Sequence, residues 1–548
     1  MGLDAAPTFA DDGSLMGVQG EVLRAVTHLA NVLPSRGLVF SRLELTPARK
    51  QGHQVDVDAF RAVGCTINET SNLEIMKSPI GDSTFTDDFA TKKVAKTADV
   101  LQRIAKLSNT HAALYLLKHQ GGRLNYLCRT TPHDHIRGAV GRHDEATRIA
   151  LEAVVGQAMT DEQWSRAILP ARLGGLGVRG YRCCADAAYV ASRMMAESRI
   201  TAIGPGLEGV SDQAMVDATG RLAPMVPSLV AGCEEDQEGE TDGPTKRPMR
   251  QQSITAKVYE AKAKAALEAA GPMMRALIQA HSAPGSGRWI HPAPDDKKER
   301  CLTRAQVTHA VRSRLGIPVT TPGTCRLCGQ CRDQFGFHDL SCTCGGDNTE
   351  RHNAVATVVY HYASRARTNP VMEKAGLLED PAVLVDMRRP ADVLIEELFD
   401  SPQSGQREIA TRTALDVKVI NAVGPEHRDA TRADPVQALT ANRRKALSWQ
   451  NTARLCADQG IMYEPLVFSA QGGVEPKAET ILTRLAALVA AEEGLQTADV
   501  KGEMLENIAF TLVRFASRAV SRRQPRLVGN IGTPPGLADP AGAESESD

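Results

Sequence analysis

The sequence predicts a multidomain protein with a mainly α-helical N-terminal half, an α/β C-terminal core and a small cysteine-rich module between them. The chain has 548 residues, enough for about three or four domains that each bury a core. Helical patterns dominate residues 89–200, and five of the 12 cysteines fall between residues 325 and 344. Segments of alternating apolar and polar residues follow after residue 370, which indicates strands.

The composition is that of a soluble globular protein, with 42% hydrophobic residues, 24% charged residues and a net charge of -1. A nearly neutral chain has no general attraction to nucleic acid, so any such affinity must come from local basic faces. No apolar run of about 18 residues occurs, and Met1–Phe9 lacks the pattern of a signal peptide. We therefore expect an intracellular protein with no membrane partner.

Near the start of the chain, two adjacent carboxylates, Asp11 and Asp12, are expected at the tip of a hairpin. A helix is predicted over Val18–Leu33 and a short apolar strand over Val39–Leu45. Paired carboxylates can hold the divalent cations that bind a triphosphate and a primer end. An Asp-Asp pair is also common in turns and helix caps, so the pair alone leaves both interpretations open.

Several short motifs follow one another in the first 180 residues. Phe9–Asp12 resembles the aromatic-x-Asp-Asp signature of reverse transcriptases, and Leu43–Lys50 resembles the strand and lysine that follow it. Ser78–Gly81 resembles the primer-gripping turn. Leu169-Pro170 with Gly174–Gly177 resembles a segment after the thumb in the polyproteins of non-LTR retrotransposons.

This resemblance implies that residues 1–88 are a partial reverse-transcriptase palm and that residues 89–230 are a thumb with a helical connection. It assigns Asp11 and Asp12 to a vestigial polymerase Mg2+ site. The fingers and the palm strand with the other metal-binding aspartate should precede Phe9, and a two-metal site needs carboxylates from both strands. We therefore expect no polymerisation by this chain alone.

The middle of the chain is expected to connect two folded parts. Residues 231–253 are acidic and contain Gly and Pro, so they are predicted to be a disordered linker, and the acidic tail 531–548 is predicted to be disordered as well. Residues 254–320 form a helical connector, with helices over Ile254–His281 and Leu302–Leu315. The second helix carries a possible nucleic-acid face made of Arg304, Arg312 and Arg314.

Residues 321–346 have the ligand spacing of a zinc module. Cys325-x2-Cys328 presents two thiolates from one tight turn, and His338-x3-Cys342 supplies the second half of a tetrahedral site. Metal binding stabilises a segment too short to bury an apolar core, so we predict a structural Zn2+ in preference to free thiols in a loop.

Cys331 and Cys344 leave the choice of zinc ligands open. The preferred set is Cys325, Cys328, His338 and Cys342, and the next best set replaces Cys342 with Cys344. The spacing departs from that of the compact retroviral knuckle. It resembles the Cys-Cys-His-Cys motif that lies just ahead of the restriction-like endonuclease in some non-LTR retrotransposons.

The region 347–530 contains the candidate catalytic groups, which lie in three strand-like segments. Asp392 and Asp416, together with Glu373, would bind Mg2+, which neutralises a scissile phosphate and activates a bound water. Lys418 lies two residues after Asp416 on the same strand face, and it would orient or help deprotonate that water. The segments are 371–373, 389–395 and 414–420, and downstream a helix over 436–459, a strand over 462–468 and a helix from residue 476 are predicted.

This arrangement resembles the PD-(D/E)xK pattern of restriction-like nucleases, with Ala391 inserted between Pro390 and Asp392. Asp-x-Lys alone occurs by chance in proteins of this length, and an exposed strand with surface ion pairs is the alternative. The position of the pattern favours the nuclease. It follows the cysteine cluster and a predicted helix, Thr349–Arg365, whose Arg-His-Asn opening resembles that endonuclease.

Basic residues of the same region are candidate nucleic-acid contacts. Solubilising helix faces are the alternative for the arginines, and a brace for the zinc module is the alternative for the histidine. Lys445 is also a candidate active-site cation, although a phosphate contact is favoured. The candidates are Arg351, His352, Arg443, Arg444, Lys445, Arg514, Arg518 and Arg522.

Together these resemblances imply the C-terminal part of a non-LTR retrotransposon polyprotein. Such a chain would nick target DNA in a metal-dependent reaction and would hold an incomplete reverse transcriptase. Its partners would be the DNA target and the RNA of the element, and its location would be the nucleus. Two alternatives are a catalytically inactive nucleic-acid-binding remnant and a stand-alone nuclease of the repair or resolvase type.

Overall fold

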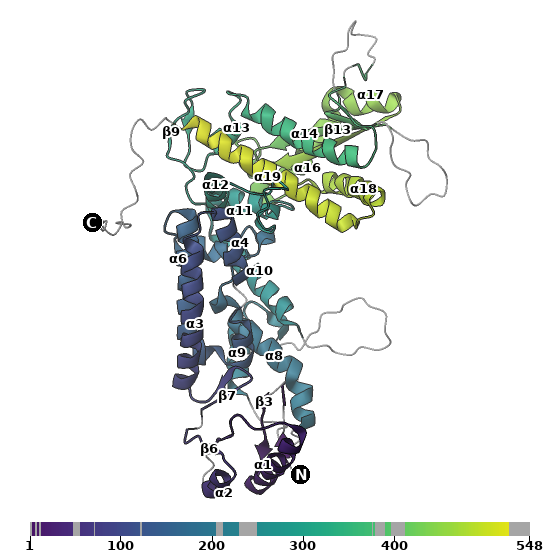
Figure 1. The fold of residues 1–548 in the computed structure, drawn as a ribbon. Coiled ribbons are helices and arrows are strands. Elements are labelled where there is room, and N and C mark those ends of the chain that lie inside the picture. Colours follow the sequence, from purple (N-terminus) through teal and green to yellow (C-terminus); the bar gives the residue numbers. More distant parts are fainter. Residues whose placement is uncertain are drawn as a thin grey trace, which may run out of the picture.

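The computed structural model (Figure 1) shows a multidomain, mostly helical protein with small sheets. In Figure 1 the N-terminal residues, in purple, lie at one end of a column of helices, and the green and yellow C-terminal part lies across the other end. The structure describes residues 3–5, 8–9, 12–47, 55–70, 72–120, 123–203, 212–229, 249–374, 376–378, 390–395 and 412–524. Within these ranges, none of the helices has both the length and the apolar character that crossing a bilayer requires.

The N-terminal region consists of short strand pairs and one long helix. β2 (Thr8–Phe9) and β3 (Asp12–Gly13) pair antiparallel with Phe9 opposite Asp12, as expected for a hairpin. Asp11 lies outside the described residues. The other elements are β1 (Leu3–Ala5), β4 (Met16–Gly17), α1 (Gln19–Val32), η1 (Leu33–Arg36), β5 (Glu44–Leu45), α2 (Val57–Ala62), β6 (Thr66–Ile67), β7 (Leu73–Ile75) and β8 (Ser78–Ile80).

The strand predicted over Val39–Leu45 is mostly wrong. Only its last two residues form a strand, β5, because they alone pair with a neighbour, β6. Val39 is 81% exposed, so the apolar character of this segment does not reflect burial in a sheet.

Helices occupy most of residues 83–315, as the sequence predicts. The side chain of Asp82 caps the start of α3 by accepting the Phe85 N–H at 2.8 Å. α3 packs along α6, and residues of α4, α6 and α12 share a core. The helices are α3 (Ser83–Ala105), α4 (Thr110–Gln120), α5 (Asn125–Thr130), α6 (His133–Val155), α7 (Asp161–Ala167), η2 (Ala171–Leu173), α8 (Tyr181–Ile203), α9 (Gln213–Leu222), η4 (Pro227–Leu229), α10 (Gln251–Ala269), α11 (Pro272–Ser282), η5 (Arg288–Ile290) and α12 (Arg304–Leu315).

Two helices of the predicted connector, 254–320, pack into the preceding helical region. Val258 of α10 shares a core with α8 and α9, and Val307 of α12 shares one with α6. The single helix predicted over Ile254–His281 is two helices, α10 and α11. The break comes at Gly271-Pro272, because proline lacks the N–H of a continuing helix and is favoured at a first helical position. Most of the predicted linker, 231–253, lies outside the described residues, as does the whole tail 531–548.

Two arginines of α12 hold backbone carbonyls and do not form the predicted nucleic-acid face. Arg314 is 1% exposed, and it donates from Nε to Gly175 O at 2.6 Å and from Nη1 to Ser286 O at 3.1 Å. Arg312 donates from Nε to Val155 O at 3.1 Å. The guanidinium groups therefore join α12 to the glycine-containing loop after α7 and to the end of α6.

The C-terminal part is built on a four-stranded mixed sheet in the order β11, β12, β13, β14. β11, β12 and β13 pair antiparallel, whereas β13 and β14 pair in parallel along their whole length. Each predicted strand segment of this region therefore contains a strand. The strands are β11 (Val371–Met372), β12 (Val393–Ile395), β13 (Arg412–Ile420) and β14 (Ile461–Ser469).

Helices cover both faces of this sheet. Leu415 and Val417 are buried against α14, α18 and α19, which confirms their predicted position on one face of β13. Ala414 of the opposite face packs against Cys456 of α17. The helices are α14 (Asp347–Arg365), α15 (Arg428–Ala433), α16 (Gln437–Ser448), α17 (Thr452–Asp458), α18 (Pro476–Glu493) and α19 (Thr497–Arg523).

The helix predicted over 436–459 is interrupted between α16 and α17. Gln450 and Asn451, in η6 (Trp449–Asn451), have φ values of 47° and 56°, which a continuous α-helix excludes. The chain turns at this point, and both α16 and α17 pack on β14.

The cysteine-rich module consists of β9 (Gly323–Thr324), β10 (Cys331–Arg332) and α13 (Phe337–Ser341). It lies at the end of the sheet, where Asn421 follows β13. The Asn421 Nδ2 donates to Phe337 O at 2.9 Å and to Ser341 Oγ at 2.8 Å. The module is thus fixed to the strand that carries Asp416 and Lys418.

Candidate metal centre and carboxylate row

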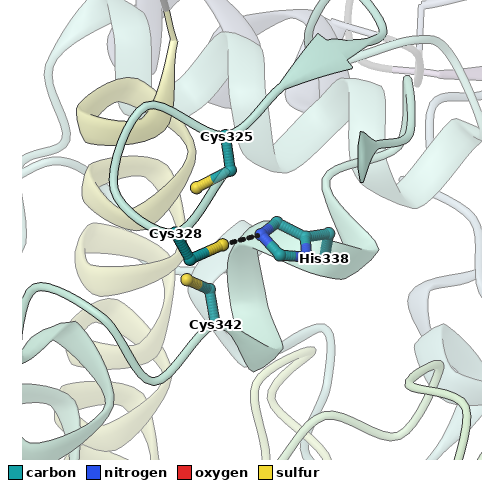
Figure 2. Close-up of side chains that lie close together, drawn as sticks. All are labelled: Cys325, Cys328, His338 and Cys342. Atoms are coloured by element: carbon teal, nitrogen blue, oxygen red, sulfur yellow. Dashed lines mark hydrogen bonds between the residues drawn. The ribbon is translucent and has the colours of Figure 1, made fainter. Parts of the chain in front are cut away.

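Cys325, Cys328, His338 and Cys342 come together in the module (Figure 2). Their ligand atoms all lie within 4.8 Å of one another, and the Cys328 Sγ is 3.3 Å from the His338 Nε2. Three thiol sulfurs and one imidazole nitrogen are a ligand set of structural zinc sites, so this cluster could hold a zinc ion. Among the described residues it is the only group of Cys, His, Asp or Glu that converges in this way, and it is the preferred set of the sequence.

A tight turn after Cys325 positions the first two ligands. The Gly329 N–H donates to Cys325 O at 2.8 Å, and the Cys325 N–H donates to Gln330 O at 2.8 Å. Gly329 has a φ of 74°, which favours glycine because it has no Cβ. Cys331 and Cys344 are both exposed and lie outside the cluster, so the alternative ligand set is not the one that this geometry forms.

Polar contacts hold the second half of the module together with apolar packing of Phe337 and Leu340. The Asp333 carboxylate accepts the N–H of His338 at 2.9 Å and so fixes the start of α13. Arg332 and Asp339 form two hydrogen bonds of 2.7 Å each, and their side chains are 1% and 0% exposed. Removal of either partner would destabilise the fold, because it would leave a buried charge without a counter-charge.

The pKa values of two of the three thiols are lowered, which favours metal binding. Burial raises the pKa of Cys342, but the Arg523 guanidinium and a backbone N–H outweigh it and bring the pKa below its usual value. Backbone N–H groups of the turn likewise outweigh burial and lower the pKa of Cys325. A backbone N–H also lowers the pKa of Cys328, but burial and the two neighbouring thiols raise it to about 11. A divalent cation would offset this crowding of negative charge, because it binds the thiolate form.

Arg523, at the end of α19, joins the module to α14. Its side chain is 0% exposed, and its Nη2 donates to Cys344 O at 2.8 Å and to Cys342 O at 3.1 Å. Its Nη1 donates to the Asp347 carboxylate at 2.7 Å. Asp347 lies in the first turn of α14, where a negative charge is favoured, and it also accepts from Arg522 at 2.9 Å.

Three arginines of α19 that are candidate nucleic-acid contacts form contacts within the protein. We call Arg514, Arg518 and Arg522 the arginine stripe. Arg518 forms ion pairs with Asp347 and Glu350, and Arg522 pairs with Asp347. Arg514 donates to backbone carbonyls before α12. These arginines join α19 to α14 and to the helical region. The side chains of Arg518 and Arg522 are still 41% and 37% exposed, so the prediction of a nucleic-acid contact stays open for them.

Two further candidate nucleic-acid contacts also have internal roles. Arg351 is 3% exposed and donates to a backbone carbonyl of α13 at 3.4 Å. Arg443 pairs with Glu464 and donates to a backbone carbonyl of β14, so it attaches α16 to the sheet. Arg444 and Lys445 are exposed, and the prediction of a phosphate contact stays open for these two.

Three carboxylates fall in one row across the sheet. Val393 of β12 pairs with Leu415 of β13, so the next row places Asp392 opposite Asp416. The Glu373 N–H donates to Asp392 O at 3.0 Å, which places Glu373 in the same row at the end of β11. We call Glu373, Asp392 and Asp416 the carboxylate row. The sequence predicts the strands of all three residues, but their common row follows only from the strand register.

His352, on α14, contacts this row. Its Nε2 lies 3.0 Å from the Asp392 Oδ1, and the Val417 N–H donates to the Asp392 Oδ2 at 2.6 Å. The hydrogen bond to Asp392 raises the pKa of His352, against the lowering effect of burial, and Asp416 and Glu373 raise it further. His352 therefore supports the carboxylate row and does not brace the zinc module.

Asp416 is partly buried at the centre of the sheet. Burial raises the pKa of its carboxyl group, and Asp392 raises it further. The Tyr463 hydroxyl, which donates to the Asp416 Oδ2 at 2.6 Å, and the ammonium group of Lys418 act in the opposite direction and offset only part of the increase. Asp416 thus has nearby cations and a hydrogen-bond donor, yet its charged form remains disfavoured.

No protein-family model matches the chain, and no curated protein matches it either. Function therefore has to be argued from the geometry of the two sites.

Two residues of these sites, Tyr463 and Asp347, are absent from the sequence-based predictions of function. Arg523 is expected to join the arginine stripe as a nucleic-acid contact, but it is buried beside the module. Tyr463 lies in the predicted strand 462–468, but its contact with Asp416 depends on the parallel register of β13 and β14. Arg523 follows the arginine stripe by one residue, and Asp347 precedes the Arg-His-Asn triplet. An acidic residue at a predicted helix start beside a metal module is the signal that could have indicated Asp347.

Proposed function

We propose that this chain is a metal-dependent endonuclease that nicks DNA. The observation that supports the proposal most is the position of Asp392, just before β12 and in the row of Asp416 on the adjacent β13, with Lys418 two residues further along β13. Two carboxylates and an ammonium group in this order are the groups that phosphodiester hydrolysis requires. The alternation of β13 carries Asp416 and Lys418 on the same face of the strand.

The donor set of the carboxylate row fits Mg2+, which prefers carboxylate oxygens and keeps several waters. Asp392 and Asp416, with Glu373 beside them, would hold the ion. Bound there, Mg2+ supplies charge neutralisation at the phosphate and lowers the pKa of a coordinated water. Lys418 would orient the attacking water and stabilise charge on the phosphate.

His352 would control access to one of these ligands. Its contact with the Asp392 Oδ1 occupies an oxygen that a metal ion would use, while Val417 occupies the other. Metal binding would therefore require the imidazole to give up this contact. The contact itself holds Asp392 toward α14 until then.

The Cys3His cluster is proposed to hold a structural Zn2+, with no open ligand position for catalysis. In this interpretation the chain is the C-terminal part of a non-LTR retrotransposon protein, with Asp11 and Asp12 left from a reverse-transcriptase palm that does not polymerise alone. DNA and the RNA of the element would be its partners, and a chromosomal target would place it in the nucleus. An upstream coding sequence for palm and fingers would support this origin over a stand-alone repair nuclease.

The test is a nicking assay on supercoiled plasmid with Mg2+, using the full chain with its zinc retained. The Asp416→Ala variant should lose nicking by about 1000-fold, since an essential metal ligand is removed. The matched control is Asp429→Ala, because the Asp429 side chain is 85% exposed on α15 and forms a surface pair with Arg432, and this variant should nick like wild type.

A second function is favoured by one specific observation. Both oxygens of Asp392 are already hydrogen-bonded, which suits a nucleic-acid-binding protein without catalysis. DNA binding by wild type and Asp416→Ala, with no nicking by either above the protein-free background, would establish this alternative and end the claim of an enzyme.

A further inference from the structure

Tyr463 is the one group outside the expected catalytic set that donates a hydrogen bond to Asp416 among the described residues. Its hydroxyl lies 2.6 Å from the Asp416 Oδ2. A bond of this length to a carboxylate is charge-assisted and stronger than a neutral hydrogen bond. The hydrogen bond involves the Oδ2 of Asp416 and does not involve the Oδ1.

The sheet and α17 determine the position of the Tyr463 ring. Parallel pairing places Tyr463 beside Ala414, two residues before the level of Asp416 on β13, so the side chain reaches diagonally to the carboxylate. The ring packs with Cys456 of α17 and with Ile461 in the core on this face of the sheet. A packed ring gives its hydroxyl little freedom, and the hydroxyl therefore acts as a fixed donor.

The protonation of Tyr463 is secure. Burial raises the pKa of its hydroxyl above the ordinary value near 10, and the neighbouring Asp416 raises it further. The hydroxyl is therefore the donor in the hydrogen bond to Asp416.

We propose that Tyr463 is a positioning residue that holds the Asp416 carboxylate in the orientation that a divalent cation requires. This inference rests on the proposed function of the carboxylate row. Groups that orient a metal ligand in this way typically change metal affinity or activity by about 10- to 100-fold when they are removed. A purely structural hydrogen bond would change stability and leave metal affinity as it was.

Tyr463→Phe removes only the hydroxyl and keeps the packed ring. The matched control is Tyr362→Phe, because the Tyr362 hydroxyl also donates to a carboxylate, Glu503, at 2.9 Å, away from the carboxylate row. Both variants lose one tyrosine–carboxylate bond. Only the first loses a bond to a proposed metal ligand.

The experiment measures Mn2+ binding by the full, zinc-retaining chain and the Mg2+ concentration that gives half-maximal nicking. Wild type, Tyr463→Phe, Tyr362→Phe and Asp416→Asn are compared. Tyr463→Phe should weaken Mn2+ binding and raise the half-saturating Mg2+ concentration by at least about 10-fold, with little loss of the rate at saturating Mg2+. Tyr362→Phe should match wild type, and Asp416→Asn should abolish binding at this site.

The outcomes separate this inference from the proposed function. Wild-type nicking with an unchanged Mg2+ requirement in Tyr463→Phe would overturn the role of Tyr463 and leave the nuclease in place. Mn2+ binding that depends on Asp416 and Tyr463 without any nicking would overturn the nuclease and support the positioning role. Tighter binding in Tyr463→Phe, or no Asp416-dependent binding in wild type, would overturn the positioning role.

Discussion

His352 and Asp392 are in contact across the interface between α14 and the sheet, with 3.0 Å between the imidazole Nε2 and the carboxylate Oδ1. Because Asp392 raises the pKa of His352 in the folded protein, the contact stabilises the fold when the imidazole is charged. This contribution is complete below the unfolded pKa of about 6.5 and is lost as the pH rises through the higher folded pKa.

We therefore predict a pH-dependent effect of His352→Gln on the free energy of unfolding. The variant should be less stable than wild type by up to about 1 kcal/mol near pH 6, and this difference should shrink toward pH 9. Urea denaturation of both proteins across this range, without added Mg2+, measures it. A difference that is constant with pH would show that the charge of His352 does not contribute.

Asp416→Asn should stabilise the fold while it abolishes nicking. Burial raises the folded pKa of Asp416, so its ionised form opposes folding at neutral pH, and the neutral amide removes that opposition. An increase in Tm of about 2–4 °C corresponds to about 1 kcal/mol in a domain of 150–250 residues. Thermal unfolding at pH 7 checks the direction, with Asp429→Asn as an exposed control, and a lower Tm for Asp416→Asn would contradict it.

Removal of metal from the module should lower the stability of the C-terminal part. Cys342→Ser should retain less zinc than wild type and should unfold at a lower temperature, because one of the four ligands of the cluster is lost. Cys331→Ser is the matched control, since Cys331 is exposed and outside the cluster. Metal content by mass spectrometry and Tm measure both effects, and equal zinc loss in the two variants would refute the ligand set.

Arg523→Met should destabilise the protein by about 3 kcal/mol, because Asp347 stays buried while one of its hydrogen-bonded cations is removed. Arg514→Met, also on α19, should cost under about 1 kcal/mol, since Arg514 donates to exposed backbone carbonyls. Chemical denaturation of the two variants provides the comparison. Similar losses would mean that the network of Asp347 contributes no more than surface contacts do.

The sequence predicts the local features of this protein well. The four side chains of the Cys3His cluster, the alternation along β13 and the helix that carries His352 all depend on residues close together in the chain. Spacing and periodicity report such features directly. The sequence does not predict the interruption at Gln450 or the break before Pro272, because a helical pattern continues across both positions.

The partners of charged residues could not be predicted, because they depend on how distant segments pack. Arg314 and Arg351 look like exposed cations in the sequence. Each is instead buried and donates to a carbonyl from another part of the fold. The same limit applies to Tyr463, whose contact with Asp416 appears only once β13 and β14 are paired.

The distance along the chain between Cys342 and Arg523, 181 residues, has a consequence for biosynthesis. At about 5–20 residues per second, a ribosome would release the complete set of zinc ligands roughly 10–40 s before the guanidinium that closes over them. During that interval the nascent segment could acquire its ion while lacking its final support from α19. Translation order thus makes the last helix the element that completes a module begun far upstream.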